Sequence, residues 1–84
     1  MNKKKLFISN INFSVTPKEL REAAEIYGEV VNCNILMDRE TRKSRGMGFV
    51  EFNTEKDAEA ALNGLKGKSI KGREIRVDYA KERN

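Results

Sequence analysis

Histidine is missing from this 84-residue chain, and cysteine occurs once, at Cys33. Without histidine, the chain lacks the side chain that most often performs general acid–base catalysis near neutral pH. A single cysteine cannot form a disulfide within the chain or supply a cysteine-rich metal site, so neither is expected. An enzyme is therefore the least expected class, no cofactor or metal is predicted, and the lone cysteine indicates a reducing compartment.

Long apolar segments are also missing. No run approaches the roughly 20 apolar residues that cross a bilayer as a helix. Residues 1–5 lead into a predicted strand without the apolar segment of a signal peptide. We therefore expect no membrane partner and a cytoplasmic location, or the nucleus or an organelle if the source is a eukaryote. The balance of 38% hydrophobic and 36% charged residues predicts one small domain over residues 1–84, with its core over residues 5–81.

Basic residues are scarce in two segments that we predict to be helices. Residues 17–29 contain two basic and four acidic residues, and residues 54–63 contain one basic and three acidic residues, so each segment has a net charge of −2. Because the whole chain has a net charge of +4, the remaining residues carry +8. This distribution favours a polyanionic partner that approaches the strands and loops, although acidic helices are also simply well solvated.

The segment over residues 45–52, RGMGFVEF, predicts a strand with two different faces. One face holds Gly46, Gly48, Val50 and Phe52. The other face holds Arg45, Met47, Phe49 and Glu51. The glycine-containing face suits close packing against a helix, whereas a ring between charges on an open face suits a stacked base and its phosphate. The alternative is that Phe49 is an ordinary core residue in another register, and this strand alone leaves both open.

Two helices are predicted from their first residues. Thr16 can cap a helix with a proline in its first turn, and Glu19 completes a capping box. Thr54 can cap a second helix. Gly28 and Gly64 are the expected ends of the two helices. The buried stripes are predicted to contain Leu20, Ala23, Ala24 and Tyr27 in the first helix and Ala58, Ala61, Leu62 and Leu65 in the second.

Three further strands are predicted over residues 5–11, 30–37 and 73–79. Alternation points one set of their side chains away from the helices. This set contains Lys5, Phe7 and Ser9, then Asn34, then Arg76 and Asp78. Residues 66–72 connect the second helix to the last strand, with a short hairpin around Ile70.

The element order is therefore βαββαβ, which predicts an α+β fold, a ferredoxin-like two-layer sandwich. Right-handed crossovers place both helices on one face of a four-stranded antiparallel sheet with strand order 4-1-3-2. The first and third strands are then neighbours, which places Phe7 beside Phe49 on the open face. Because two strands each contribute a ring there, the pattern favours a binding platform.

Residues 45–52 resemble the RNP1 octamer of the RNA-recognition motif, K/R-G-F/Y-G/A-F-V-x-F/Y, and residues 6–11, LFISNI, resemble its RNP2 hexamer. Residues 38–41 and 72–73 also resemble loops common in this family. The resemblance covers residues 5–81 and implies a sheet whose RNP aromatics stack the bases of single-stranded RNA. The chain is similar to short RNA-binding proteins of bacteria, and it could equally be a domain cut from a longer protein.

The resemblance also implies roles for single residues. Phe7 and Phe49 would stack two successive bases, and Arg45 would pair with a phosphate. Met47 departs from the family, which usually places an aromatic ring there against the sugars, and Ala24 stands where the family usually has phenylalanine. The residues predicted to bind RNA are Lys5, Phe7, Asn10, Asn34, Arg45, Met47, Phe49, Arg76, Asp78 and Lys81. Predicted phosphate contacts in the loop are Arg39, Arg42 and Lys43, with a solvated loop as the alternative.

We expect a monomer that binds single-stranded RNA, or single-stranded DNA, without catalysis. The alternative is a protein-interaction module of the same fold, which the missing aromatic at Met47 keeps open. Acylphosphatase-like enzymes share the order of elements, but no phosphate-cradling glycine loop follows the first strand here.

Overall fold

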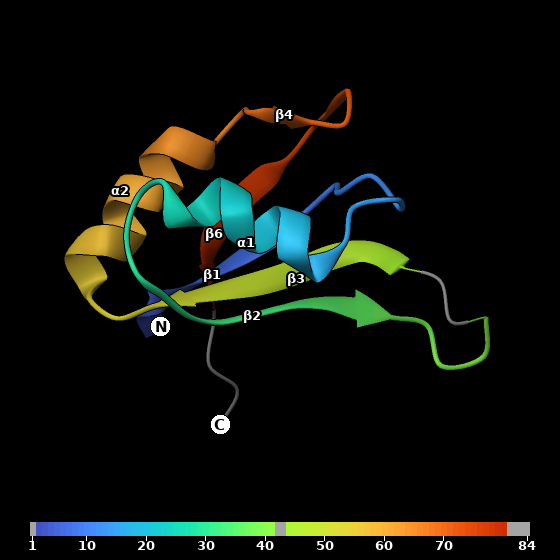
Figure 1. Ribbon diagram of the computed structural model, residues 1–84, viewed down its shortest axis with the longest axis horizontal. Helices are drawn as coiled ribbons and strands as arrows, with labels where there is room; N and C mark the ends of the chain where they lie inside the picture. Colours follow the sequence, from blue (N-terminus) through green and yellow to red (C-terminus); the bar gives the residue numbers. More distant parts are fainter. Residues whose placement is uncertain (1, 42–43, 81–84) are drawn as a thin grey trace.

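A computed structural model of the protein describes residues 2–41 and 44–80, without the side chains of Ser44 and Arg45. Its elements are β1 (Asn2–Ser9), α1 (Pro17–Glu25), β2 (Val30–Met37), β3 (Ser44–Phe52), α2 (Glu55–Leu65), β4 (Ser69–Ile70), β5 (Arg73–Glu74) and β6 (Arg76–Ala80). The main sheet has the order β2-β3-β1-β6, and its neighbouring strands are antiparallel (Figure 1). With β6 as the fourth long strand, this is the predicted ferredoxin-like fold and strand order. Within the described residues, no helix is long and apolar enough to cross a membrane.

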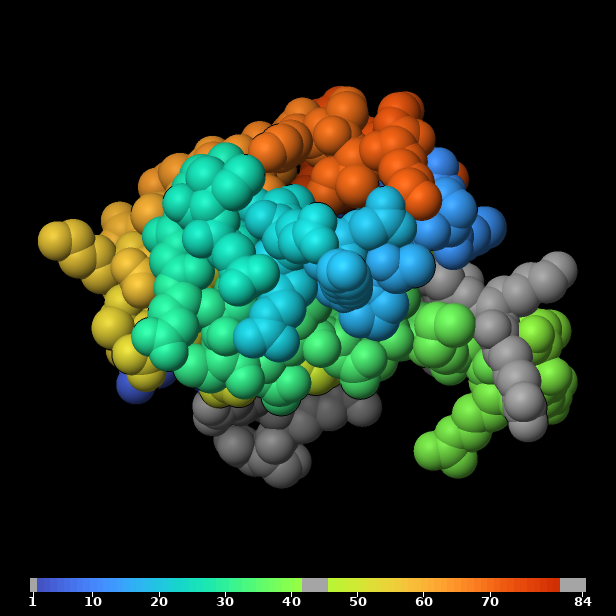
Figure 2. Space-filling view, in the orientation of Figure 1, coloured from blue at the N-terminus to red at the C-terminus, as the bar shows by residue number. Residues whose placement is uncertain are grey.

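Both helices lie on one side of the main sheet. In the space-filling view from this side, α1 and α2 cover the middle strands (Figure 2). The core between the layers comes from alternate strand residues and from the apolar stripes of the helices. It includes Leu6, Ile8, Val50 and Phe52 from the sheet and Leu20, Ala24, Ala58, Ala61 and Leu65 from the helices. The predicted inward face of β3 is therefore confirmed, and neither α1 nor α2 lies over the opposite face of the sheet.

The N-terminal caps of both helices form as predicted. The Thr16 hydroxyl accepts from the backbone N–H of Glu19 at 3.2 Å, and the Glu19 carboxylate accepts from the Thr16 N–H at 3.1 Å. The Thr54 hydroxyl accepts from the Asp57 N–H at 3.1 Å. The bond from the Thr16 backbone, followed by the one from the Lys71 side chain, lowers the pKa of Glu19 from its usual value. The local hydrogen bonds that the sequence predicted thus begin both helices.

The predicted helix ends at Gly28 and Gly64 are wrong. Helix α1 ends at Glu25, and Gly64 lies inside α2. Both glycines instead allow close packing, because a Cβ at Gly28 would collide with the Asp57 side chain and one at Gly64 would collide with the ring of Tyr27. The glycine with a positive φ near the end of α2 is Gly67, at 78°.

The strand boundaries also differ from the predicted ones. The first strand occupies Asn2–Ser9 instead of residues 5–11, and the last predicted strand divides at Ile75 into β5 and β6. Strands β4 and β5 form the short hairpin predicted around Ile70. Lys71 and Gly72 both have positive φ, at 52° and 80°, as a two-residue hairpin turn requires. This hairpin lies beside the end of β1, because Asn10, which follows β1, is hydrogen-bonded to Arg73 and Glu74.

Candidate nucleic-acid interface

Phe7 and Phe49 lie directly opposite each other on neighbouring strands β1 and β3. Their sequence neighbours Leu6 and Val50 are fully buried, so the two rings point to the open face. Phe7 is 36% exposed, and Phe49 is half-buried. Directly opposed residues have Cβ atoms about 4.5–5.5 Å apart. The structure therefore excludes the alternative in which Phe49 belongs to the core, and it brings both rings together.

The two rings belong to one row of side chains across all four strands. Asn34 of β2 is opposite Phe49, and Asp78 of β6 is opposite Phe7. Asn34 and Asp78 are exposed, although the Asn34 side-chain oxygen accepts from the Ile35 N–H at 2.9 Å. We call Asn34, Phe49, Phe7 and Asp78 the central row. It presents two rings between one amide and one carboxylate, which is an arrangement that could hold two bases and read their edges.

Lys5 covers part of the site. Its ammonium nitrogen lies 4.1 Å from the centre of the Phe49 ring, within the range of a cation–π interaction. Lys5 and Glu51 are opposite each other on β1 and β3, so the ammonium group and a carboxylate share this end of the open face. A base that stacks on Phe49 would have to displace this ammonium group. Phe7 is therefore the more accessible ring of the pair.

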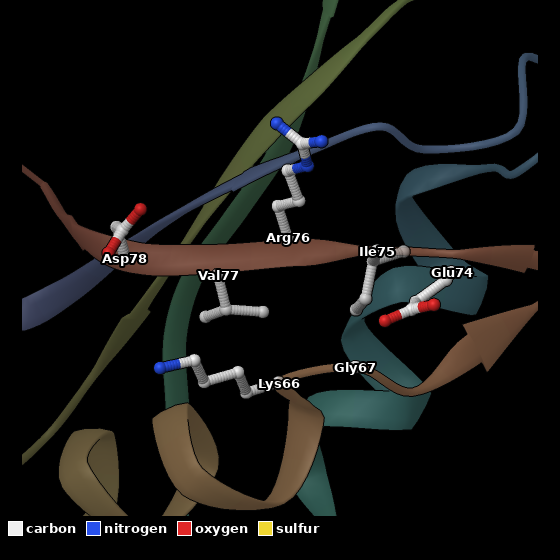
Figure 3. A pocket seen from close by; sticks show the side chains of 7 residues that line it. All are labelled: Lys66, Gly67, Glu74, Ile75, Arg76, Val77 and Asp78. Carbon is white, nitrogen blue, oxygen red and sulfur yellow. The ribbon is translucent and has the colours of Figure 1, made fainter.

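Other predicted site residues border the central row. Met47 is half-buried and precedes Phe49 by two residues, so both side chains lie on the open face. Arg76 is exposed and lies opposite Ser9. Figure 3 shows Arg76 and Asp78 projecting from one side of β6, whereas Ile75 and Val77 project from the other. The predicted orientation of the last strand is therefore confirmed.

Asn10 has a role within the protein that the sequence did not reveal. Its side-chain nitrogen donates to the Glu74 carbonyl at 2.7 Å, and its side-chain oxygen accepts from the Arg73 guanidinium at 2.9 and 3.1 Å. The backbone of Asn10 has a positive φ of 58°. These bonds tie the end of β1 to the β4–β5 hairpin, so the amide supports the shape of the site and is engaged before any ligand arrives.

Several predicted phosphate contacts cannot be placed. Arg42, Lys43 and Lys81 lie outside the described residues, as does the side chain of Arg45. Arg39 is exposed and lies in a turn. The Asp38 carboxylate supports this turn by accepting hydrogen bonds from the backbone N–H groups of Glu40 and Thr41. Their roles stay predictions.

Two residues near the site had no assigned role in the sequence analysis. Asn32 is exposed and lies opposite Glu51, which places it on the open face. Phe13 follows β1 in the loop before α1 and is 66% exposed. The available signal for Phe13 was an aromatic residue between the turn-forming Asn12 and Ser14. Exposure itself could not be read from the sequence, because a loop residue has no fixed periodicity.

Comparisons with known proteins agree with this geometry. A family model described as "RNA recognition motif" matches residues 6–76. The chain is 43% identical over 83 residues to "Glycine-rich RNA-binding protein 3, mitochondrial" of Arabidopsis thaliana, with 99% of this chain and 27% of that protein aligned. The chain spans between about one fifth and three fifths of the length of the curated relatives considered.

Solved structures show the same architecture. "RNA Binding Protein PG1" aligns with a TM-score of 0.90 and 36% identity, over 96% of this chain and 98% of that one. A "Sxl-lethal protein/RNA complex" aligns with a TM-score of 0.92 and 26% identity, over 99% of this chain and 50% of that one. The arrangement of helices and sheet is therefore shared with proteins whose names state RNA binding.

Proposed function

The chain belongs to the RNA recognition motif family and is an RNA-binding domain, and from this premise we propose that it binds single-stranded RNA on the central row. The observation that carries the proposal is the pairing of Phe7 with Phe49 on the sheet face opposite α1 and α2. Flat rings on an open sheet can stack only with bases that are unpaired. Single-stranded RNA is therefore the proposed ligand, with single-stranded DNA as a weaker competitor.

Each part of the row has a proposed task. One base stacks on Phe7, and the next stacks on Phe49 after the Lys5 ammonium moves from the ring toward a phosphate. At the two ends of the row, the Asn34 amide can donate and accept hydrogen bonds, whereas the Asp78 carboxylate only accepts. A carboxylate there favours bases that present an amino group.

The cationic groups around the row are proposed to contact phosphates. Arg76 is exposed at one edge of the open face. Arg45 and Lys81 are proposed to contact phosphates as well. So are three residues of the loop between β2 and β3, which are Arg39, Arg42 and Lys43. Counterion release from these contacts would make affinity fall as salt rises.

We also propose that the domain acts as a monomer and without catalysis. The names of relatives bear on its location, because the Arabidopsis protein is called mitochondrial. They support the organelle alternative over the cytoplasm that the sequence first indicated. The comparisons lend no support to a protein-interaction module.

The proposed function is tested by titrating the protein with labelled single-stranded RNA at low and at moderate salt. Binding should be saturable, should be stronger than binding to a duplex of the same sequence, and should weaken as salt rises. The Phe49→Ala variant supplies the control, because it removes a stacking surface and leaves the net charge unchanged. Equal binding by Phe49→Ala and the unaltered protein would show that the sheet is not the RNA site.

A further inference from the structure

Strand β6 forms one edge of the main sheet, and among the described strands it pairs with β1 alone. An edge strand carries backbone N–H and C=O groups that no neighbouring strand pairs, and proteins usually cover or interrupt such an edge. The opposite edge, β2, is interrupted, because its register against β3 shifts near both ends. The register of β6 against β1 is regular from Arg76 to Tyr79. The edge of β6 is therefore the one at which a further strand fits.

Two hydrogen bonds show in which direction the backbone groups of this edge point. The Glu74 carbonyl points toward β1, since it accepts from the Asn10 side chain just after that strand. The next residue, Ile75, points the other way, and its N–H donates to the Lys68 carbonyl at 3.0 Å. Backbone groups of an extended chain alternate in direction from one residue to the next. The residues that follow Ile75 at intervals of two therefore point away from β1.

Val77 and Tyr79 are these residues, so their N–H and C=O groups form a row along the edge. Within the part of the chain that the structure describes, this row has no partner, because the chain covers the edge only as far as Lys68, opposite Ile75. Two donors and two acceptors thus face solvent with the spacing of a strand. This alternation suits the backbone of another extended peptide. It suits RNA less well, because phosphate oxygens only accept hydrogen bonds.

A groove of about 410 Å³ runs along this edge, between β6 and the residues that follow α2 (Figure 3). It is lined by Lys66 and Gly67 on one side and by residues 74–78 on the other. Val77 projects toward Lys66, and the exposed side chain of Lys66 extends past it. Residues that pair across two strands point their side chains to the same face of the sheet. A residue added opposite Val77 would therefore direct its side chain toward the Lys66 ammonium group.

The charges at this edge define a complementary sequence. Arg76 and Asp78 are exposed and project from the open face of β6. Opposite charges on directly opposed residues are favourable, so an acidic residue fits opposite Arg76 and a basic residue fits opposite Asp78. The residue between these two lies opposite Val77, where an acidic side chain meets Lys66. In the antiparallel orientation, the added strand therefore reads basic, acidic, acidic from its N-terminus to its C-terminus.

A second copy of this chain does not meet these requirements. Antiparallel pairing of two β6 strands about Val77 would place Tyr79 of the second copy against Ile75, where Lys68 already occupies the edge. Pairing about Asp78 would place two carboxylates directly opposite each other, which is unfavourable. A peptide segment of another protein avoids both conflicts, because it can leave the edge before it reaches Lys68.

We propose that the edge of β6 binds an extended peptide of a partner protein as a fifth, antiparallel strand of the main sheet. The peptide carries a basic residue opposite Asp78 and acidic residues opposite Val77 and Arg76. This inference goes beyond the proposed function and does not depend on it, because backbone groups at the edge make the contact. The peptide borders the RNA site only through Arg76 and Asp78.

The first test adds the capped peptide Thr-Thr-Lys-Glu-Glu to the protein without RNA and follows amide hydrogen exchange by NMR. In the free protein, the amides of Val77 and Tyr79 should exchange rapidly, whereas those of Arg76 and Asp78, which face β1, should be protected. When about nine-tenths of the protein is bound, exchange at Val77 and Tyr79 should slow by roughly tenfold. The proposal is overturned if these two amides are already protected in the free protein or if they do not respond to the peptide. It is also overturned if no binding occurs at a peptide concentration on the order of 1 mM.

The second test methylates single backbone nitrogens of the peptide. The first glutamate lies opposite Val77, so its N–H should donate to β6, whereas the N–H of the lysine opposite Asp78 should point to solvent. Methylation at the glutamate should weaken binding by roughly tenfold, and methylation at the lysine should leave it unchanged. Equal affinities of the two methylated peptides would show that no strand is added at this edge.

The third test compares two charge variants of the protein, Lys66→Gln and Lys56→Gln, which lose the same charge at exposed positions. Only Lys66→Gln should weaken peptide binding, by up to about fivefold at low salt. Equal losses would mean diffuse charge attraction and would contradict a site in the groove. If single-stranded RNA protects the amides of Val77 and Tyr79 and the peptide does not, the edge belongs to the RNA site and the peptide proposal is wrong.

Discussion

Phe7 and Phe52 lie on neighbouring strands and differ only in the side of the sheet on which they stand. Phe52 is 1% exposed, beneath the helices, whereas Phe7 is 36% exposed on the face opposite α1 and α2. The same ring therefore stabilises the core in one place and is available to a ligand in the other. This contrast provides an internal control for the proposed site.

The two aromatic residues of the central row should matter more for binding than for stability. Phe7→Ala and Phe49→Ala should each weaken RNA binding by roughly 1–3 kcal/mol, which is the usual contribution of one stacked base. Phe52→Ala should lower the free energy of unfolding by about 3–5 kcal/mol, because it empties a buried site. Binding isotherms and denaturant unfolding curves measure the two effects. Unfolding of Phe49→Ala as easily as Phe52→Ala would contradict the assignment of faces.

Met47 distinguishes this domain from members of its family with an aromatic ring at the same position. Methionine is flexible and can cover a sugar, but it loses rotamer freedom when a ligand holds it in place. Met47→Phe should therefore tighten RNA binding, by about 0.5–1.5 kcal/mol if the new ring stacks as aromatic pairs do. Stability should change little, because the side chain lies on the open face.

This prediction is checked with one uracil-rich and one guanine-rich oligomer. A gain on both would show that Met47 weakens a general platform. A loss on either would indicate that Met47 fits a particular ligand, and the general stacking model would need revision.

At the scale of elements, close approach explains two glycines that do not end helices. Gly28 faces the Asp57 side chain at the start of α2, and Gly64 faces the ring of Tyr27 after α1. Tyr27 is packed against the core and thereby joins the end of one helix to the side of the other. The helices can pack this way because both positions lack a Cβ.

Gly64→Ala is the matching test. In an isolated helix, alanine would be favoured over glycine by about 1 kcal/mol. Here the added methyl group would displace the Tyr27 ring, so we expect the free energy of unfolding to fall by about 1–3 kcal/mol. Asn63→Ala, at an exposed position of the same helix, should be neutral or slightly stabilising. Thermal or denaturant melts decide, and stabilisation by Gly64→Ala would show that Tyr27 moves aside without cost.

The partly buried thiol of Cys33 is one of the contacts between α1 and the sheet. The Cys33 sulfur lies 3.6 Å from the Pro17 carbonyl oxygen, and burial raises the pKa of this thiol. Because the thiolate is the reactive form, Cys33 should be inert in the folded protein. It therefore belongs to the packing of β2 beneath α1 and not to the RNA site.

At the scale of the whole molecule, the layer formed by the two helices is acidic, whereas the rest of the chain is basic. The two acidic helical segments form one layer, and the net charge of +8 belongs to the rest of the chain. A polyanion is therefore attracted to the sheet side and the loops more than to the helices.

Neutralising cations on the two sides of the molecule should have different effects. Two double variants, Arg76→Gln with Arg45→Gln and Arg76→Gln with Lys81→Gln, should weaken binding to most RNA sequences. Each lost phosphate contact should reduce the salt slope by about 0.7. Lys18→Gln and Lys56→Gln, on exposed helix positions, should do neither. Salt titrations of the four variants measure this, and equal effects on both sides would mean that RNA is held by diffuse attraction.

Local sequence was sufficient for the order of the elements, for the starts of both helices and for dividing strand residues between two faces, but not for the ends of the helices or the bounds of the strands. Alternation in residues 45–52 placed Phe49 and Phe52 on different faces without deciding which face is buried, and the pairing of Thr16 with Glu19 identified the start of α1. Each of these depends on residues within a few positions of one another, so the chain carries the information without its tertiary structure. The order of elements, with right-handed crossovers, then predicted the strand order.

Tertiary structure decided which groups are free to meet a ligand. Asn10 is predicted from sequence to bind RNA, yet its amide is engaged by Arg73, 63 residues away. The Lys5 ammonium rests on the Phe49 ring, and the exposure of Phe13 depends on a loop held by the distant hairpin. These contacts join parts of the chain that are far apart in sequence, and no local periodicity reports them. The sequence by itself determined the sheet and its two rings, whereas folding determined which side chains around those rings are already occupied.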